Sequence, residues 1–386
     1  ALCFSPIPAI GTFGVYASLG VAVAAATALW FLPGWLAAFV EAPRQHGALE
    51  HATLRARLLG RRLVAFVSVR GLVVLVPFAI VAGVLAACAV RVRVDNDPMR
   101  ILDPSESFRR DTEWLARRLG GVDTIGMLVP AHSSALSPET GALLAARLAE
   151  APGVIGFSGP PRMAGNGDVL VGVTLAPSGS SAREELFDRV EAGFAELGHE
   201  DVHLVGTAVR IARDSGNLVR GQIEGLALVV PLLALTMAIG LRSLRLGLLG
   251  LVPNVLPCVF LYGTLVLVDR PLSVSTVMIG SALMGLIVDD TIHLLHRYRK
   301  GLDAGRSRRA ALADAVGLAG RPITVTSVVL AIGLGISAFG ELETTIEFGV
   351  FAAATVLIAW MLGLFVLPAL LLRRTASRPF AGRTAE

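Results

Sequence analysis

Two adjacent aspartates and two histidines lie near the end of a long apolar stretch, in the sequence GLIVDDTIHLLHRYRK at residues 285–300. Asp289 precedes Arg297 by eight residues, which is about 12 Å along a helix. An aspartate deep in a membrane costs ~2.5–3.5 kcal/mol, so its presence favours a function. Hydrocarbon favours the uncharged carboxyl group, which brings proton uptake and release towards neutral pH. His293 lies four residues after Asp289 and three after Asp290, within reach of both, so the pattern predicts a proton relay.

The same side chains allow two other interpretations. The carboxylates and imidazoles of DDTIHLLH suit a metal ion, although no second cluster of ligands occurs on another apolar stretch. Alternatively, the acids pair with a cation or a helix end and serve only the structure. The relay is favoured because paired acids deep in a helical membrane bundle are characteristic of pumps. His296 adjoins Arg297, and for His296 alone the favoured interpretation is a side chain that faces the membrane interface.

A second apolar stretch offers hydroxyl groups that would support the relay. Residues 321–340 read RPITVTSVVLAIGLGISAFG, in which Arg321 marks the edge of the membrane. Thr324 and Ser327 share one helix face, and Ser327 lies about 9 Å from that edge. Both hydroxyls are therefore predicted to hydrogen-bond to the aspartates. The competing interpretation is that Thr324, Thr326 and Ser327 bond to the backbone of their own helix.

The helix that carries the aspartates also has small residues on one face. Ser281 and Gly285 lie eight and four residues before Asp289 and continue its face. Small residues let two membrane helices approach closely. This face is therefore predicted to pack against another helix.

The composition is that of an integral membrane protein. Of the 386 residues, 54% are hydrophobic and 17% charged, against about 25% charged in an ordinary soluble domain. The net charge of +4 comes from basic residues in short loops beside apolar stretches, which indicates membrane orientation signals rather than nucleic-acid binding. Cys3, Cys88 and Cys258 fall in or beside these stretches and predict no disulfide framework. Membrane spans are predicted at residues 13–36, 71–90, 222–241, 246–267, 273–295, 322–340 and 348–372.

The basic residues of the connecting segments predict the orientation of the chain. Lys and Arg number six in 41–70 and seven in 297–321, but one in 268–272 and none in 341–347. Cytoplasmic loops carry an excess of Lys and Arg. The basic segments are therefore expected in the cytoplasm, and residues 91–221 on the opposite side.

Residues 91–221 alternate between strand and helix patterns and predict an extracytoplasmic α+β domain of the ferredoxin-like class. Ser105 is expected to cap the first helix, and Ser137 the second, with Pro138 in its first turn. Ser181 and Glu184 have the spacing of a capping box for the third helix. No cysteine and no dense cluster of His, Asp and Glu occurs there, so no enzyme site is predicted. Strands are expected at 91–97, 124–130, 153–159, 168–175 and 202–206, and helices at 106–120, 137–151 and 181–197.

The two ends of the chain carry an internal repeat. A shift of 335 residues places Phe13-Gly14-Val15 on Phe348-Gly349-Val350 and Leu32-Pro33 on Leu367-Pro368 without a gap. Between residues 4 and 36, eleven positions are identical. Membrane transporters are commonly built from such repeats. Residues 1–40 therefore look like the end of one half, and 71–372 like a complete second half.

The sequences GLIVDDTIHLLHRYRK, GRPITVTSVVLAIGLGISAFG and IEFGVFAAATVLIAWMLGLFVLPALL together resemble the resistance–nodulation–division (RND) superfamily. More narrowly they resemble its MMPL and predicted-exporter branch, which is related to Patched and sterol-sensing domains. The resemblance covers essentially the whole chain. It implies a polytopic α-helical membrane protein in which twelve helices form two six-helix halves, each with an extracytoplasmic domain after its first helix. This chain would be the C-terminal half, as a fragment.

Under this resemblance each segment has an expected place. The segments would be, in order, the sixth helix at the end of the first half (1–40), a cytoplasmic linker (41–70), the seventh helix (71–90), a periplasmic porter-like domain (91–221), helices eight to twelve (222–372) and a cytoplasmic tail (373–386). The outer domain is considerably shorter than in the multidrug branch, which argues against docking to an outer-membrane channel.

The resemblance also implies a secondary active transporter rather than an enzyme: a proton-driven exporter of lipids or other hydrophobic compounds in the cytoplasmic (inner) membrane. Family members use acids on their fourth and tenth helices for proton flow, a role that transfers to Asp289 and Asp290. The expected partners are a hydrophobic or lipid substrate, membrane lipid, the N-terminal half of the same chain and a second copy in a homo-oligomer, without nucleic acid, metal or a cofactor beyond the proton gradient. The alternatives are a sterol-sensing-like lipid-binding or scaffold protein without active transport, and a membrane metal-dependent enzyme.

Overall fold

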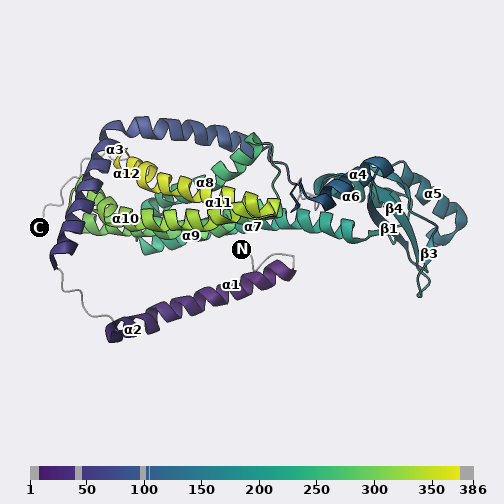
Figure 1. Cartoon of the computed structure of the whole chain (residues 1–386), viewed down its shortest axis with the longest axis horizontal. Helices are drawn as coiled ribbons and strands as arrows, with labels where there is room; N and C mark the ends of the chain where they lie inside the picture. The colour runs from purple at the N-terminus through teal and green to yellow at the C-terminus, as the bar shows by residue number, and fades with distance from the viewer. Residues whose placement is uncertain (1–7, 40–45, 96–100, 104, 374–386) are drawn as a thin grey trace, which may run out of the picture.

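The computed structural model describes residues 8–39, 46–95, 101–103 and 105–373. A bundle of long helices forms one part of the molecule, and a small α+β domain projects from one end of the bundle (Figure 1). The helices long and apolar enough to cross a membrane lie at Gly14–Phe39, Arg57–Ala89, Ile223–Gly240, Leu244–Leu267, Ser275–Asp303, Arg308–Phe339 and Glu343–Arg373. These seven spans confirm the predicted polytopic membrane fold.

The internal repeat predicted from the sequence reappears in the backbone. At the N-terminal end, α1 (Pro8–Ala26) is joined to α2 (Leu32–Phe39) by the π-helical segment η2 (Thr27–Phe31). At the other end, α11 (Glu343–Met361) is joined to α12 (Leu367–Arg373) by the π-helical segment η6 (Leu362–Val366). The two π segments are 335 residues apart, the same shift as in the sequence. Each is followed by a Leu-Pro pair, and since proline lacks the N–H that a regular helix needs, a local π turn accommodates it.

Helix α3 (His46–Ala89) is longer than the sequence suggested. It contains 44 residues, with non-helical backbone angles only at Arg70, and its apolar span begins at residue 57 rather than 71. The described part of the predicted linker at 41–70 is therefore helical rather than a loop. Val64 and Val67 explain the difference, because both are buried against other membrane helices in spite of the arginines around them.

The small domain has the predicted ferredoxin-like topology. The strands β1 (Asp123–Val129), β2 (Val154–Phe157), β4 (Val169–Leu175) and β5 (His203–Val205) form an antiparallel sheet in the order β2-β4-β1-β5. Helix α5 (Pro138–Ala149) connects β1 to β2, and α6 (Ser180–Glu196) connects β4 to β5, which gives the βαββαβ arrangement. A short strand, β3 (Arg162–Met163), extends the edge of β4.

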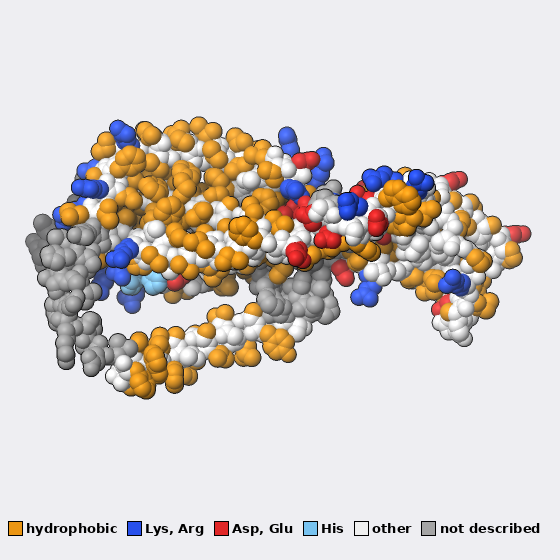
Figure 2. Space-filling view, in the orientation of Figure 1, with side chains coloured by type: hydrophobic (Ala, Val, Ile, Leu, Met, Phe, Trp, Pro, Cys, Tyr) orange, Lys and Arg blue, Asp and Glu red, His pale blue; other side chains and the backbone are white. Residues whose placement is uncertain are grey.

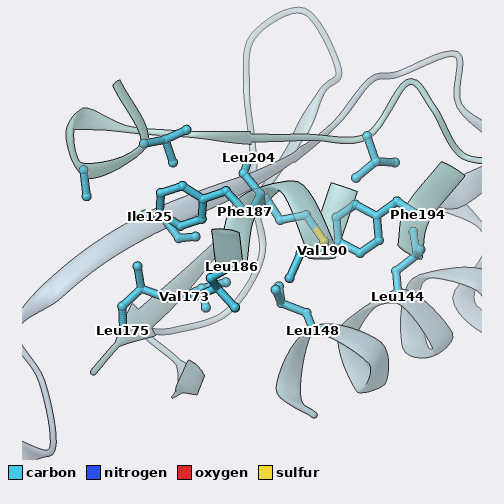
Figure 3. Packing of buried hydrophobic residues seen from close by; sticks show 14 of the residues in the cluster. Ile125, Leu144, Leu148, Val173, Leu175, Leu186, Phe187, Val190, Phe194 and Leu204 are labelled. Atoms are coloured by element: carbon cyan, nitrogen blue, oxygen red, sulfur yellow. The ribbon is translucent and has the colours of Figure 1, made fainter. Parts of the chain in front are cut away.

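The core of the small domain lies between the sheet and its two helices (Figure 3). Phe187 and Phe194 of α6 and Leu144 and Leu148 of α5 are completely buried there. They meet Ile125 and other inward-facing strand residues, so alternating strand positions and helical spacing combine into one core.

The helix starts in this domain agree with the sequence in one case of three. Ser137 caps α5 as predicted, accepting a hydrogen bond from the Thr140 N–H with Pro138 in the first turn. Helix α4 (Ser107–Leu119) instead begins after Glu106, because the Ser105 hydroxyl donates to Asp103. The capping box predicted for α6 is also wrong: Gly179 occupies the cap position.

The first strand predicted for this domain, at 91–97, is reduced in its described part to a single bridge. Val94 pairs in parallel with Leu272, which lies just before the helix that carries the aspartates. The Ser181 hydroxyl donates to the Val94 carbonyl oxygen, and the Asp95 carboxylate accepts from the Ser180 N–H at 2.7 Å. The segment therefore ties the start of α6 to the membrane bundle instead of joining the sheet.

Helix α7 (Thr207–Gly240) runs without interruption from the small domain into the bundle, so a boundary placed at 221 falls inside it. It is followed by α8 (Leu244–Leu267), α9 (Val274–Asp303) and α10 (Arg308–Gly335), the last ending in the 3₁₀ segment η5 (Ile336–Phe339). Figure 2 shows hydrophobic side chains along the flank of the bundle and Lys and Arg at its end away from the small domain. This end is called the basic end below.

Two arginines join the small domain and the turn before α9 to the start of α11. Arg109 of α4 donates to Glu343 at 3.1 Å, and Arg270 donates to Glu343 and to Glu347. Partial burial lowers the pKa of Arg109, but its hydrogen bonds with Glu113 and Glu343 outweigh this and raise the pKa overall. The hydrogen bond to Glu343 likewise raises the pKa of Arg270. Both guanidinium groups therefore remain charged and hold the two parts together.

Candidate functional site

Asp290 lies on the face of α9 that packs against α10. Its side chain is half-buried, with Oδ2 3.4 Å from the Ser327 hydroxyl and Oδ1 3.5 Å from the Thr326 hydroxyl. Ser327 itself is only 3% exposed. The Thr326 hydroxyl lies closer to two carbonyl oxygens of its own helix, those of Pro322 at 3.1 Å and Ile323 at 3.0 Å, as the competing interpretation predicted. The Ser327 hydroxyl therefore provides the clearer contact between α10 and the carboxylate, as the sequence predicted for Ser327.

A small cavity adjoins this carboxylate. It lies between α9, α10 and the end of α11, has a volume of about 20 Å³, and is lined by Asp290, Thr291, Ser327 and Trp360 among apolar side chains. A space of roughly 10–15 Å³ by this measure holds one water when polar partners surround it. The site thus has room for about one water molecule beside Asp290.

Asp289 and His293 have the opposite environment. Their side chains are 75% and 67% exposed, and Asp289 Oδ1 lies 3.4 Å from His293 Nε2, one helical turn away. Because Asp290 faces α10 while these two groups face outward, the ligands of the DDTIHLLH sequence do not converge on one point. That geometry disfavours the metal-site interpretation.

The remaining predicted residues take different roles. The Thr324 hydroxyl donates to the Gly320 carbonyl of its own helix at 2.7 Å and accepts from the Trp360 indole N–H at 3.0 Å, so the predicted bond to an aspartate is wrong. The Ser281 hydroxyl donates to the Met278 carbonyl, one turn earlier. A Cβ on Gly285 would meet no atom within 4 Å. Ser281 and Gly285 were predicted to allow another helix to approach closely. Among the residues that the structure describes, no helix packs against Gly285 in this way.

Sequence reasoning missed Asn254 of α8. This side chain is completely buried; its amide donates to the Gly250 carbonyl at 2.6 Å, and its oxygen accepts from the Thr291 hydroxyl at 3.4 Å. A lone amide within an apolar span was the available signal, because polar groups in membrane helices face the protein interior. His296 is exposed, near the basic end of α9.

Three interhelical polar pairs thus run across four successive helices, and we call them the polar seam. They are Asn254–Thr291 between α8 and α9, Asp290–Ser327 between α9 and α10, and Thr324–Trp360 between α10 and α11. Of these groups, Asp290 alone is a titratable acid. Within the described residues, no group of three or more His, Cys, Asp and Glu side chains is arranged to hold a metal ion.

The amino-acid sequence of this chain is similar to the sequences of known proteins. The MMPL family model matches residues 166–385. The "Heme uptake protein MmpL11" of Mycobacterium tuberculosis is 28% identical over 94% of this chain and 40% of its own length. The "Mycolic acid-containing lipids exporter MmpL11" of Mycolicibacterium smegmatis is 27% identical over 94% of this chain and 41% of its own length. The chain therefore spans about 40% of the length of these relatives.

Among solved structures, a crystal structure of SecDF in its super-membrane-facing form aligns with 80% of this chain and 37% of that one. Its TM-score is 0.41, at 14% sequence identity.

Proposed function

We propose, because this chain belongs to the MMPL family, that it forms part of a proton-driven exporter of lipids or other hydrophobic compounds. The protein would be a secondary active transporter of the cytoplasmic membrane rather than an enzyme. The observation that carries the proposal is Asp290, an acid held between two membrane helices beside hydroxyl donors and a water-sized cavity. It lies inside the region that the family model matches.

The geometry suggests how proton binding would move the helices. An ionised Asp290 accepts a hydrogen bond from the Ser327 hydroxyl of α10, whereas a protonated Asp290 becomes a donor itself. Protonation therefore changes the free energy of the contact between α9 and α10. A water in the adjacent cavity would deliver the proton, and a rocking of the two helices would follow each change of charge.

Asp289 and His293 would act as a second station of the relay. Their exposure within a membrane-spanning helix is costly unless a protein surface covers them. In the span at Gly14–Phe39, Gly14 is buried and nearly all the other residues are exposed, so this helix also offers its surface to lipid or to further protein. Since the relatives are more than twice as long as this chain, we propose that another part of a full-length protein covers this face and carries the rest of the pathway. A second copy of the chain is the alternative occupant.

The class of cargo is supported by the relatives. One of them is named for export of mycolic acid-containing lipids and another for heme uptake. Because the two names specify different cargoes, the proposal for this chain stays at hydrophobic compounds. The small domain is proposed to lie on the periplasmic side, which agrees with Lys and Arg gathering at the opposite end (Figure 2).

The test is Asp290→Asn in the full-length protein, reconstituted in vesicles with an imposed pH gradient. Asparagine keeps the shape but takes up no proton, so we expect at least a tenfold loss of substrate-driven proton flux with normal insertion. Ser281→Ala is the matched control on the same helix, because its hydroxyl bonds only to its own backbone in the described structure. Full proton-coupled transport by the Asp290→Asn protein would refute the relay. Lipid binding by the unaltered protein without any transport that an uncoupler abolishes would favour the scaffold or binding class instead.

A further inference from the structure

An apolar groove opens between α3 and α10, near the basic end of the bundle. Its volume is about 650 Å³, within the range of small-molecule sites. Leu59, Leu63 and Leu364 supply apolar walls, and two arginines, Arg62 and Arg321, line it as well. The groove is separate from the water-sized cavity beside Asp290, and it shares no lining residue with that cavity.

Glycines explain why the groove exists. A Cβ on Gly60 would lie 2.3 Å from the Ala313 carbonyl oxygen and 2.5 Å from the Gly317 nitrogen, so α3 and α10 touch backbone to backbone at this point. Beside this contact, Gly320 leaves the floor of the groove without a side chain. A Cβ there would meet only side-chain carbons, at 3.6 Å and beyond. The helices thus stay fixed at one point while the adjacent space remains open.

The two arginines give the groove its chemical character. Both are exposed, and neither forms an ion pair with an acid among the described residues. Leu59 is 66% exposed on the same rim. A guanidinium binds phosphate oxygens in a forked geometry, and basic pockets between membrane helices on the cytoplasmic side bind anionic lipid head groups. An occupant with one anionic head and a long apolar tail fits both parts of the groove.

The geometry points to an anionic phospholipid as the occupant, with its phosphate between Arg62 and Arg321 and an acyl chain along the leucines. The lipid would come from the membrane leaflet at the basic end. At its inner limit the groove reaches Thr324, whose hydroxyl accepts from Trp360 in the polar seam. A bound chain would therefore stiffen the pairing of α3, α10 and α11. This inference does not depend on proton-driven transport, since the site binds lipid whether or not Asp290 carries protons.

Titration of the purified protein in detergent with phosphatidylglycerol, followed by native mass spectrometry, tests this site. Removing one arginine is expected to weaken binding about fivefold, so Arg62→Gln with Arg321→Gln is expected to weaken it about twenty-five-fold. The matched control is Arg61→Gln with Arg309→Gln, two exposed arginines of the same helices that do not line the groove. The control removes the same charge and is expected to bind as the unaltered protein does.

Three further measurements separate the occupants. Phosphatidylcholine with the same acyl chains is expected to bind at least tenfold more weakly, and inorganic phosphate is expected not to compete at millimolar concentration. Gly320→Leu, which fills the groove without changing charge, is expected to reduce binding as well. Equal loss in the control pair, equal affinity for both lipids, competition by phosphate alone, or unchanged binding in Gly320→Leu would each overturn the proposal. A stable dimer of the unaltered protein that Gly320→Leu dissociates would identify a second copy as the occupant instead.

Discussion

The small α+β domain and the membrane bundle place their large apolar side chains in opposite positions. In the domain, Phe187, Phe194 and Leu144 are completely buried (Figure 3). In the bundle, residues of the same kind remain on the surface, with Val69 81% and Ile239 68% exposed. The apolar side chains of the small domain are buried because removing apolar surface from water is favourable. Lipid tails give no such gain, so membrane helices associate through close packing and polar contacts.

Functional groups are therefore expected at different places in the two parts of the molecule. In the domain the buried polar side chains Ser133, Ser180 and Arg183 lie where helices begin, whereas in the bundle buried polar residues also occur in the middle of the membrane spans. Asn254, Thr291 and Ser327 are among the most buried residues of their helices. The candidate site therefore coincides with the interior of the bundle, and the core of the domain serves mainly to hold its sheet and helices together.

The largest effect is expected for Phe187→Ala in the domain. Removing a completely buried ring leaves a cavity and costs about 3–5 kcal/mol. Hydrogen exchange of β1 and β4 would report the loss locally. Phe157→Ala is the control, because this residue is 43% exposed at the end of β2 and its truncation leaves no enclosed cavity, so a smaller loss is expected. Equal protection of the two variants would mean that the domain is not held by its apolar core.

A smaller effect of the same sign is expected when one methyl group is added inside the bundle. In Gly263→Ala the new Cβ would lie 2.4 Å from the Leu85 carbonyl oxygen of α3, and such overpacking costs about 1–3 kcal/mol. Gly285→Ala has nothing within 4 Å, and alanine in a helix is favoured by roughly 0.5–1 kcal/mol. Thermal unfolding in detergent should move in opposite directions for the two variants. A gain in both would indicate that helix propensity, rather than helix packing, controls the bundle, and a loss in both would mean that Gly285 is also packed against another surface.

The fold of the domain was predictable because its signals are local. Strand alternation and helical spacing located β1, β4, α5 and α6, and Ser137 capped its helix by contacts within three residues. Ser181 failed as a cap because its hydroxyl donates to Val94, which is distant in the sequence. The continuous α7 was missed for a related reason: the polar first half of this helix belongs to the domain and its apolar second half to the membrane.

In the bundle, composition located the spans but not the direction in which each side chain faces. The sequence predicted that Ser327 approaches an aspartate, and the structure agrees for Asp290. It gave Thr324 the same role, but the Thr324 hydroxyl donates to Gly320 of its own helix, and the second hydroxyl near Asp290 is that of Thr326, at 3.5 Å. Which of two hydroxyls faces α9 depends on the rotation of α10, which is set by packing against α3 and α11 and not by the spacing of residues in the chain. The difference in exposure between Asp289 and Asp290 has the same origin.

The smallest effect is expected for the pair Asn254–Thr291 in the polar seam, and it tests how far polar contacts stabilise the bundle. A double-mutant cycle with Asn254→Leu and Thr291→Val, measured by unfolding in detergent, removes the contact while keeping similar volume. Such hydrogen bonds between membrane helices contribute about 0.6 kcal/mol, and at most roughly 1.7 kcal/mol. The 3.4 Å separation between the Thr291 hydroxyl and the Asn254 side-chain oxygen favours the lower value. A coupling energy near 0.6 kcal/mol would leave close packing as the main force in the bundle. A value well above roughly 1.7 kcal/mol would make the polar seam a principal stabilising element of the bundle. A change of charge on Asp290, which belongs to the seam, would then alter the free energy of unfolding of the whole bundle.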